Sequence, residues 1–256
     1  MASKPIIIVS NDDGITYKGL KTLVECIADL AEVIVVAPNK PQSAMGHSVT
    51  IHYPLMVTKS KQFPGIEAYE CSGTPADCVK IAQSHLLGER TAAMVVSGIN
   101  HGSNTALNIL YSGTMAAAIE GAIEGLPAVG FSLGDFHADA DFSHTTIHVE
   151  KIVLQVLNHG LPKGVALNVN FPKRQEQPIQ GLRICRQANA RWVDAFSERE
   201  TPSGRPYLWL TGDFVNFDHG EDTDQWAVEH NYTSIVPCSF DLTAHHAIST
   251  LNTWNF

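Results

Sequence analysis

Short apolar runs recur along the first two thirds of the chain, and this repeat restricts the possible folds more than any other feature. The runs are rich in valine and isoleucine, and they occupy residues 5–10, 32–37, 92–97, 127–132 and 165–171. Unbroken apolar runs of this length are typical of strands that are buried on both faces of a parallel sheet. Sequence with helical spacing separates them. The alternation predicts an α/β fold, a doubly wound, Rossmann-like and mostly parallel sheet.

The helices between the runs are predicted from apolar stripes with a spacing of about 3.6 residues. One stripe consists of Leu20, Leu23, Val24, Ile27 and Leu30, a second of Cys78, Ile81, Ala82 and His85, and a third of Val149, Ile152, Val153 and Val156. Before the second stripe, Thr74 and Pro75 are followed by Asp77. A threonine cap, a proline at the first helical position and a carboxylate in the first turn predict that this helix begins there.

Two regions interrupt the alternation. Residues 48–60 and 66–71 alternate weakly between apolar and polar, which predicts a β-hairpin insertion. After Pro172 the periodicity fades, and we expect only short strands near residues 182–185 and 207–210 in a polar, turn-rich segment. This part has too few apolar residues to fold alone. We therefore expect a catalytic core at residues 1–172 and a C-terminal extension at residues 173–256 that packs on the core or on a neighbouring subunit.

The composition narrows the possible partners and compartment. With 256 residues, 44% of them hydrophobic, the chain can bury a large core. A net charge of −9 without a basic block argues against duplex nucleic acid as a partner. Five cysteines without a CxxC pair suggest reduced thiols in a cytoplasmic protein. No apolar stretch approaches the roughly 18 residues that a membrane helix needs, so we expect no membrane association.

The candidate functional residues follow the predicted strands. Asp12 and Asp13 come directly after the first strand, and Gly14 follows them. In doubly wound sheets, ligands bind beyond the carboxyl ends of the strands. The other polar residues at these ends are Ser43 and Ser48 after the second strand, Asn100 and Asn104 after the strand at 92–97, and Ser112, Gly113 and Thr114 at a helix start. We expect these groups to meet at one edge of the sheet.

The chemistry of these groups indicates a hard divalent cation. Asp12 and Asp13 repel each other, and burying them is costly without a compensating charge. The set contains carboxylate, hydroxyl and amide oxygens but no Cys–His pair, which favours Mg²⁺ or Mn²⁺ over zinc. Gly14 allows the sharp turn that brings both carboxylates to one ion.

The segment Ser112–Gly113–Thr114 offers a site for an anion. A helix N-terminus has free backbone N–H groups and the positive end of the helix dipole, and here two hydroxyls are added. A cation next to an anion site suggests the hydrolysis of phosphate esters, because a metal ion polarises a phosphoryl oxygen and lowers the pKa of bound water.

Each motif alone also has a structural explanation. Asp12-Asp13-Gly14 can be a plain turn, Ser112 a simple N-cap, and Asn100 and Asn104 turn formers. Only the joint occurrence of these motifs indicates a functional site. Neither GxGxxG nor GxxxxGK[ST] is present, which argues against dinucleotide-binding and P-loop proteins.

Taken together, the motifs resemble one family, the stationary-phase survival nucleotidases or SurE family. The similar segments span most of the chain in the family's order: NDDG, AP followed by a loop with Ser43, SGTPADCV, VVSGIN with GSN, YSGTMAAAIEGA, NVNFP and TDQWAV. The resemblance implies a metal-dependent phosphomonoesterase that acts on nucleoside 5′- and 3′-monophosphates, in some members also on short polyphosphate.

The resemblance also implies roles for individual residues. Asp12, Asp13, Ser43 and Asn100 would hold one divalent cation per subunit, and Asn104, Ser112, Gly113 and Thr114 would hold the phosphate. Asp12 and Asp13 would be the catalytic residues. Members are homodimers or homotetramers in which C-terminal segments are exchanged. Three positions depart from the family pattern: Ala106 replaces a common glycine, His101 follows the metal-binding asparagine, and Asn108 stands near a usual aspartate.

Alternatives remain open at this point. Attack by an activated water, with Asp13 as general base or acid, is preferred over an aspartyl-phosphate intermediate. Both carboxylates are assigned to the metal, and Asp12 and Asp13 are adjacent rather than in the DxD spacing usual for aspartyl-phosphate phosphatases. A non-catalytic nucleotide-binding oligomer, acting as a sensor, could use the same anion site. A haloacid-dehalogenase-like phosphatase is disfavoured because the aspartates after the first strand lack the DxD spacing and no lysine stands in a matching late motif.

Overall fold

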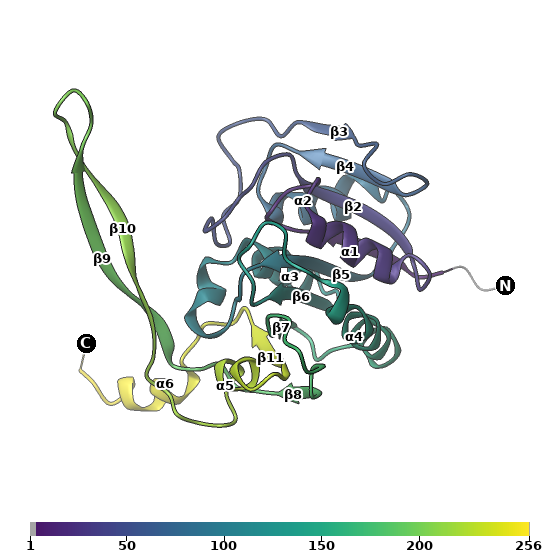
Figure 1. Ribbon diagram of the computed structural model, residues 1–256. Coiled ribbons are helices and arrows are strands. Elements are labelled where there is room, and N and C mark those ends of the chain that lie inside the picture. The colour runs from purple at the N-terminus through teal and green to yellow at the C-terminus, as the bar shows by residue number, and fades with distance from the viewer. Residues whose placement is uncertain (1–3, 256) are drawn as a thin grey trace.

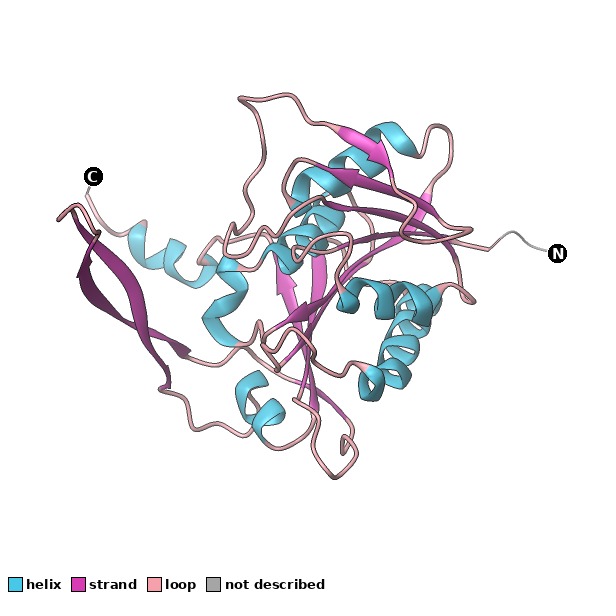
Figure 2. Ribbon diagram, turned by 45° about the horizontal axis from the view of Figure 1, so that its top comes forward, coloured by secondary structure: helices cyan, strands magenta, loops and turns pink. Residues whose placement is uncertain are grey.

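The computed structural model, which describes residues 4–255, is built around a nine-stranded, mostly parallel sheet (Figures 1 and 2). Its strand order is β3-β4-β2-β1-β5-β6-β7-β11-β8. The strands are β1 (Ile6–Ser10), β2 (Glu32–Pro38), β3 (Val57–Lys59), β4 (Glu67–Cys71), β5 (Ala92–His101), β6 (Ala128–Leu133), β7 (Val165–Phe171), β8 (Leu182–Ile184) and β11 (Thr233–Ser239). The five predicted strands correspond to β1, β2, β5, β6 and β7, so the doubly wound α/β fold is confirmed.

Helices cover both faces of this sheet (Figure 1). The helices α1 (Lys18–Ile27) and α4 (Thr146–His159) pack in one apolar cluster on one face. The helices α2 (Pro75–Ile81) and α3 (Gly113–Ile123) pack in a second cluster on the other face. Short helical turns at Ala82–Leu86, Ala106–Tyr111 (η2) and Ser143–Thr145 complete this part. The sheet is therefore buried on both sides, as its unbroken apolar strands require.

The apolar stripes and the cap found in the sequence account for these helices. Leu20, Leu23, Val24 and Ile27 are buried on α1, and Val149, Ile152, Val153 and Val156 are the buried residues of α4. At the start of α2, the Thr74 hydroxyl accepts a hydrogen bond from the Asp77 backbone N–H at 3.2 Å, and the Asp77 carboxylate accepts one from the Thr74 N–H at 2.9 Å. This reciprocal capping box, with Pro75 at the first helical position, confirms the predicted helix start.

The predicted hairpin is present at one edge of the sheet. Strand β3 pairs antiparallel with β4, and β4 pairs in parallel with β2, so the hairpin is part of the main sheet. Its first strand is only three residues long, shorter than the expected range of 48–60, and residues 48–56 form no strand.

The C-terminal part of the chain contributes to two different structures. Strands β8 and β11 extend the main sheet beyond β7, beside the short helix α5 (Asp224–Glu229). Strands β9 (Ala190–Glu200) and β10 (Pro206–Asn216) form a separate two-stranded antiparallel ribbon that stands away from the body, here called the arm (Figure 1). The chain ends in helix α6 (His245–Leu251).

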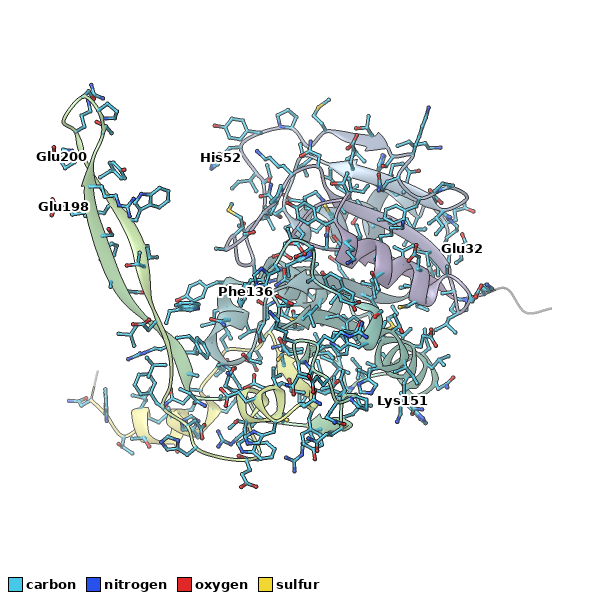
Figure 3. The ribbon with its side chains drawn as sticks, viewed as in Figure 1. Glu32, His52, Phe136, Lys151, Glu198 and Glu200 are labelled. Carbon is cyan, nitrogen blue, oxygen red and sulfur yellow. The ribbon has the colours of Figure 1, made fainter. Side chains whose placement is uncertain are left out.

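The arm corrects the expectation of a turn-rich segment with one short strand near 207–210. Each of its strands has 11 residues. Its side chains are mostly exposed, and Glu198 and Glu200 project from the ribbon into open space (Figure 3). Because such a ribbon has no buried face within its own chain, its sequence carries no alternating pattern from which two long strands could be predicted.

The cysteines and the lengths of the helices bear on two further expectations from the sequence. All five cysteines are free thiols, as expected, and only Cys238 is not buried. Within residues 4–255, no helix is long and apolar enough to cross a membrane.

Candidate active site

The candidate site lies where the order of the strands changes direction. Strand β1 pairs in parallel with β2 on one side and with β5 on the other, so successive connections leave β1 in opposite directions. The loops that follow β1 and β5 therefore separate at the carboxyl edge and leave a crevice, which is where doubly wound sheets bind ligands. Asp12 and Asp13 follow β1, and Asn100 and His101 end β5.

Asp12 is buried at the centre of this edge. It is 5% exposed, and its Oδ1 accepts a hydrogen bond from the Thr114 hydroxyl at 2.5 Å. Burial, together with the charge of Asp13, raises the pKa of Asp12 from 3.8 to about 6. The ionised form of this carboxylate thus lacks a full counter-charge in the protein, and a bound cation would supply one.

Gly113 lets the first turn of α3 approach this carboxylate. A Cβ atom at Gly113 would lie 2.6 Å from the Asp12 Cβ and 3.0 Å from its Oδ2. No side chain fits there without moving either the helix or the aspartate. Because Gly113 has no side chain, the start of α3 can lie directly against Asp12.

Ser112 caps the same helix. Its hydroxyl oxygen accepts a hydrogen bond from the Met115 backbone N–H at 3.0 Å, and the residue is 6% exposed. Ser112, Gly113 and Thr114 were predicted to lie together at a helix start, and they do. Both hydroxyls of this segment are already in use, since that of Ser112 caps α3 and that of Thr114 contacts Asp12.

Asp13 has a partner that the sequence argument noted only as a departure from the family pattern. Its Oδ2 accepts hydrogen bonds from the backbone N–H of His101 at 3.2 Å and from the His101 Nδ1 at 3.0 Å. The two residues lie 88 positions apart, so no spacing rule could have paired them.

Of the other two predicted metal ligands, Ser43 lies on the loop after β2 and Asn100 near the end of β5. Ser43 is exposed and follows Gln42, whose backbone N–H donates to the Asp12 carbonyl at 2.8 Å. The Asn100 Nδ2 donates to the Gly102 carbonyl at 2.9 Å. A cation binds an amide through its oxygen, so this bond leaves the useful atom of Asn100 uncommitted.

Asn104 is held by a buried network. Its backbone N–H donates to the Asn170 Oδ1 at 2.7 Å, its carbonyl accepts from the Asn168 Nδ2 at 2.8 Å, and its own Nδ2 donates to the Ser132 hydroxyl at 2.8 Å. The NVNF segment therefore fixes the loop after β5. The side-chain nitrogen of Asn104 is engaged with the sheet in this arrangement.

Asp224, which the sequence argument did not select, joins this loop to the base of the arm. The buried carboxylate accepts hydrogen bonds from the backbone N–H of Ala106 at 2.8 Å and of Ala188 at 2.9 Å. Ala106 has a positive φ of 54°. That conformation suits glycine better than alanine, in line with the glycine that the resemblance to the family led us to expect here.

Glu120 is a second charged residue that the sequence argument missed. Its side chain is 2% exposed, and it accepts hydrogen bonds from Lys80 Nζ at 2.6 Å and from His47 Nε2 at 2.8 Å. Burial alone would raise the pKa of Glu120, but the two hydrogen bonds and the adjacent charges lower it overall. His47 lies on the loop that carries Ser43, so Glu120 anchors that loop to α3.

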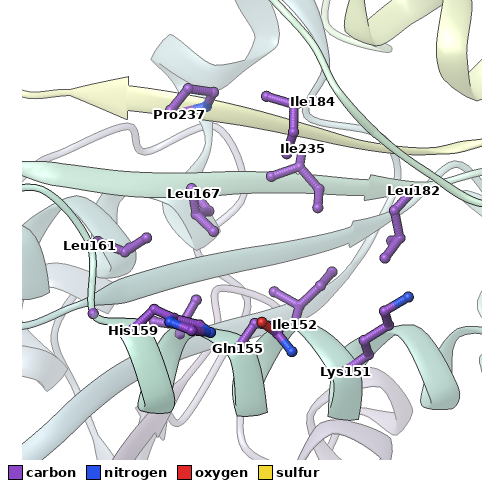
Figure 4. A pocket seen from close by; sticks show the side chains of 12 residues that line it. Lys151, Ile152, Gln155, His159, Leu161, Leu167, Leu182, Ile184, Ile235 and Pro237 are labelled. Atoms are coloured by element: carbon purple, nitrogen blue, oxygen red, sulfur yellow. The ribbon is translucent and has the colours of Figure 1, made fainter.

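A cavity elsewhere in the molecule differs in kind. It has a volume of about 360 Å³ and lies between α4 and the strands β7, β8 and β11 (Figure 4). Its lining is mostly aliphatic, with Leu161, Leu167 and Ile235 among its walls. None of its lining residues carries a carboxylate, so it does not share the chemistry of the candidate site at the carboxyl edge.

The donor set at the carboxyl edge fits a hard divalent cation. Two adjacent carboxylates, a hydroxyl and an amide oxygen are oxygen ligands, which Mg²⁺ and Mn²⁺ prefer. In the described part of the chain, no group of three or more His, Cys, Asp and Glu side chains could hold a metal ion. A site here would thus depend on the hydroxyl and amide ligands as well as on the carboxylates.

The fold and this site define a doubly wound α/β protein with paired carboxylates at its topological switch point, facing the N-terminus of a helix. The chain belongs to the SurE family. The family description "Survival protein SurE" matches residues 7–194.

Close relatives and a solved structure agree with this assignment. The chain is 57% identical to the 5′-nucleotidase SurE of Cytophaga hutchinsonii, over 99% of this chain and 98% of the relative. It is 52% identical to the 5′-nucleotidase SurE of Flavobacterium psychrophilum, with the same coverage of 99% and 98%. The crystal structure of the SurE protein from Aquifex aeolicus is similar, with a TM-score of 0.84, 34% identity and coverage of 97% of this chain and 98% of that one.

Proposed function

We propose that this chain is a metal-dependent phosphomonoesterase that hydrolyses nucleoside 5′- and 3′-monophosphates to nucleoside and phosphate. The observation that carries the proposal is the buried pair Asp12 and Asp13, with Asp12 directly against the N-terminus of α3. Relatives that are 57% and 52% identical over almost the full chain bear the name 5′-nucleotidase, which supports the same activity here.

One divalent cation per subunit, Mg²⁺ or Mn²⁺, would be held by Asp12, Asp13, Ser43 and Asn100. The raised pKa of Asp12 and the oxygen-only donor set both fit such an ion. When bound, the ion supplies polarisation of a phosphoryl oxygen and a lower pKa for water.

The phosphate would bind at Asn104, Ser112, Gly113 and Thr114. The backbone N–H groups at the start of α3 favour an anion, and the helix dipole adds to this preference. Asp13 accepts the proton of the attacking water as the new P–O bond forms opposite the leaving oxygen. The bond from phosphorus to the nucleoside oxygen then breaks, and that oxygen takes up the proton that Asp13 accepted.

Direct attack by an aspartate is the less favoured mechanism. A nucleophilic carboxylate needs an oxygen that points freely at phosphorus. In this structure Thr114 holds Asp12 Oδ1 and His101 holds Asp13 Oδ2, and the remaining carboxylate oxygens are assigned to the cation. A non-catalytic nucleotide sensor has no specific observation in its favour, and the names of the relatives speak for an enzyme.

Release of phosphate tests the proposal. A panel of nucleoside 5′- and 3′-monophosphates and short polyphosphates is incubated with Mg²⁺, with Mn²⁺ and with EDTA. We expect release with metal and none with EDTA. Asp13→Asn should abolish turnover and leave the circular dichroism spectrum unchanged. Release that persists in EDTA, or in the variant, contradicts the assignment.

The C-terminal extension supports a proposal about assembly. We expect a homodimer or homotetramer in which residues 173–256 are exchanged between subunits. The arm presents Trp192, Phe196, Leu208 and Leu210 with at least half of each side chain exposed, at 50%, 63%, 61% and 65%. Exposed apolar patches of this kind mark interaction surfaces. The five free thiols fit a reducing, cytoplasmic setting.

A further inference from the structure

His101 makes every hydrogen bond to Asp13 that is found among the described side-chain contacts. The backbone N–H and the ring Nδ1 of His101 both reach the same carboxylate oxygen, Oδ2, at 3.2 and 3.0 Å. A carboxylate held by two donors on one oxygen has a fixed orientation. Its second oxygen, Oδ1, is left for another partner.

The imidazole itself has little freedom. Its side chain is 10% exposed, and it lies edge-on to Phe142, with ring centroids 4.9 Å apart, and to Tyr17, with centroids 6.0 Å apart. Because the ionised Asp13 carboxylate can only accept, Nδ1 carries the hydrogen in this contact. Nε2 is buried and has no hydrogen-bond partner within residues 4–255. The ring is therefore held by packing on two sides and by Asp13 on the third.

We propose that His101 is a positioning residue that fixes the Asp13 carboxylate through Oδ2, so that Oδ1 alone faces the cation and the substrate. This inference rests on the proposed function, because it assigns Asp13 to a cation. Asp13 has to be held in place because of the charge of Asp12 beside it. Two like charges on adjacent residues repel, and an unrestrained Asp13 would rotate away from Asp12 toward solvent. A donor pair on Oδ2 opposes that rotation before any ion binds.

Three substitutions separate the Nδ1 donor from the packing of the ring. His101→Phe keeps a flat ring against Phe142 and Tyr17 but removes the donor. His101→Asn keeps an N–H near the position of Nδ1, whereas His101→Gln moves its N–H toward the position of Nε2. If positioning through Nδ1 matters, the phenylalanine and glutamine variants should behave alike, and the asparagine variant should resemble the wild type.

The first measurement is binding of Mn²⁺ to the full-length protein without substrate, followed by the loss of the free-ion EPR signal. We expect His101→Phe and His101→Gln to raise the Kd for Mn²⁺ about 10- to 100-fold, which is the usual effect of losing a hydrogen bond to a metal-binding carboxylate. His101→Asn should stay within about threefold of the wild type. Circular dichroism and thermal unfolding show whether each variant is folded.

Kinetics on a nucleoside monophosphate provide the second readout. With saturating Mn²⁺, kcat of His101→Phe should recover only in part, since Asp13 Oδ2 then keeps only the backbone N–H donor and is held less firmly. His159→Phe is the matched control. His159 ends α4 shortly before β7 begins, so it lies at the amino edge of the sheet, away from the site. This control should leave both the Kd and kcat unchanged.

The outcomes separate this inference from the function on which it rests. If the wild type binds Mn²⁺ and His101→Phe binds it equally well with unchanged kcat, the positioning role is wrong and the proposed function stands. Equal loss in the asparagine and glutamine variants also overturns the role, because packing rather than the Nδ1 donor would then be responsible. If the wild type binds no Mn²⁺ and releases no phosphate, the proposed function itself fails, and the role of His101 fails with it.

Discussion

The carboxyl edge of the core buries charged side chains, whereas the arm exposes apolar ones. In the core, carboxylates that would normally lie in water are buried, and each has donors within the chain; Asp77, Glu120 and Asp224 are examples. In the arm, large apolar side chains that would normally be buried are exposed. The core contains nearly all the partners that its unusual residues need. The arm lacks them, which is why we propose that a second subunit supplies them.

The base of the arm shows how the two regions are separated. The Phe217 backbone N–H donates to the Asn189 carbonyl at 2.9 Å, so the two ends of the arm are already joined beside the core. Asp224 then fastens this base to the loop after β5 through Ala188 and Ala106. We therefore expect assembly to depend on the arm and the site to depend on the core.

Removal of the arm should have the largest effect. Replacing residues 190–216 by a short glycine linker between Asn189 and Phe217 deletes the exposed apolar ribbon but keeps the hydrogen-bonded base. We expect a folded monomer by light scattering, with Mn²⁺ binding retained. An unchanged oligomer mass would show that the subunits associate through another surface.

A point variant tests the same idea with less disturbance. Phe196 and Leu210 lie opposite each other on one face of the ribbon, and Phe196→Thr with Leu210→Thr keeps β-forming residues there. Losing two buried anchors weakens an interface by at least about 4 kcal/mol if each contributes as interface hot spots do. Ile147→Thr, at an equally exposed position on α4, should not change the mass.

The burial of Asp12 predicts how the stability of the metal-free core depends on pH. Its folded pKa is raised, so the folded state holds this proton more tightly than the unfolded state. The associated stability is fully present below pH 3.8 and is lost as the pH rises through about 6. At about 1.4 kcal/mol per pH unit, the loss amounts to about 3 kcal/mol.

Asp12→Asn isolates this effect, because asparagine keeps an oxygen for the Thr114 hydroxyl but carries no charge. In urea unfolding with EDTA, we expect the variant to be about as stable as the wild type near pH 4 and more stable by about 3 kcal/mol above pH 7. It should also lose turnover. A difference in stability that stays constant across this pH range would mean that Asp12 is not strained by burial.

Gly113→Ala tests the contact between α3 and Asp12. Alanine favours helices, but its Cβ would lie 2.6 Å from the Asp12 Cβ. One of the two must shift, and a displacement of this order costs about 100-fold in kcat/KM in a positioned site. At Gly134, an alanine Cβ would lie no closer than 3.4 Å to its nearest neighbour, so Gly134→Ala is the control. Equal activity of the two variants would contradict the tight contact.

The same comparison explains how much could be predicted from the sequence. Strands β1, β2, β5, β6 and β7 were predictable because burial on both faces produces unbroken apolar runs. The arm was not, because its mostly exposed residues have no buried face within the chain to impose an alternating pattern. The sequence therefore has no local pattern that reveals the length of β9 and β10.

For the site, residues at the ends of elements were predictable, and their partners were not. Asp12, Asp13 and Ser112 stand directly after a strand or before a helix, where function and sequence position coincide. His101, Asp224 and Glu120 act across separations of 88, 118 and 40 residues from Asp13, Ala106 and Lys80. Such pairs are brought together only by the folded topology, which cannot be deduced from the spacing of residues along the chain.

Glu120 provides the mildest test, because it acts on the site only through a loop. Glu120→Gln keeps the shape of the side chain but removes the charge that holds Lys80 and His47. Both partners are partly exposed and can be solvated instead, so we expect the free energy of unfolding to fall by only about 1 kcal/mol. The loop with Ser43 should become looser, and KM should rise about tenfold while kcat changes less. Glu124→Gln, an exposed position on the next turn, should change neither. If Glu120→Gln lowers kcat and leaves KM unchanged, Glu120 acts on the chemistry and not only as an anchor of the loop, and it then belongs with the carboxylates that we propose to be catalytic.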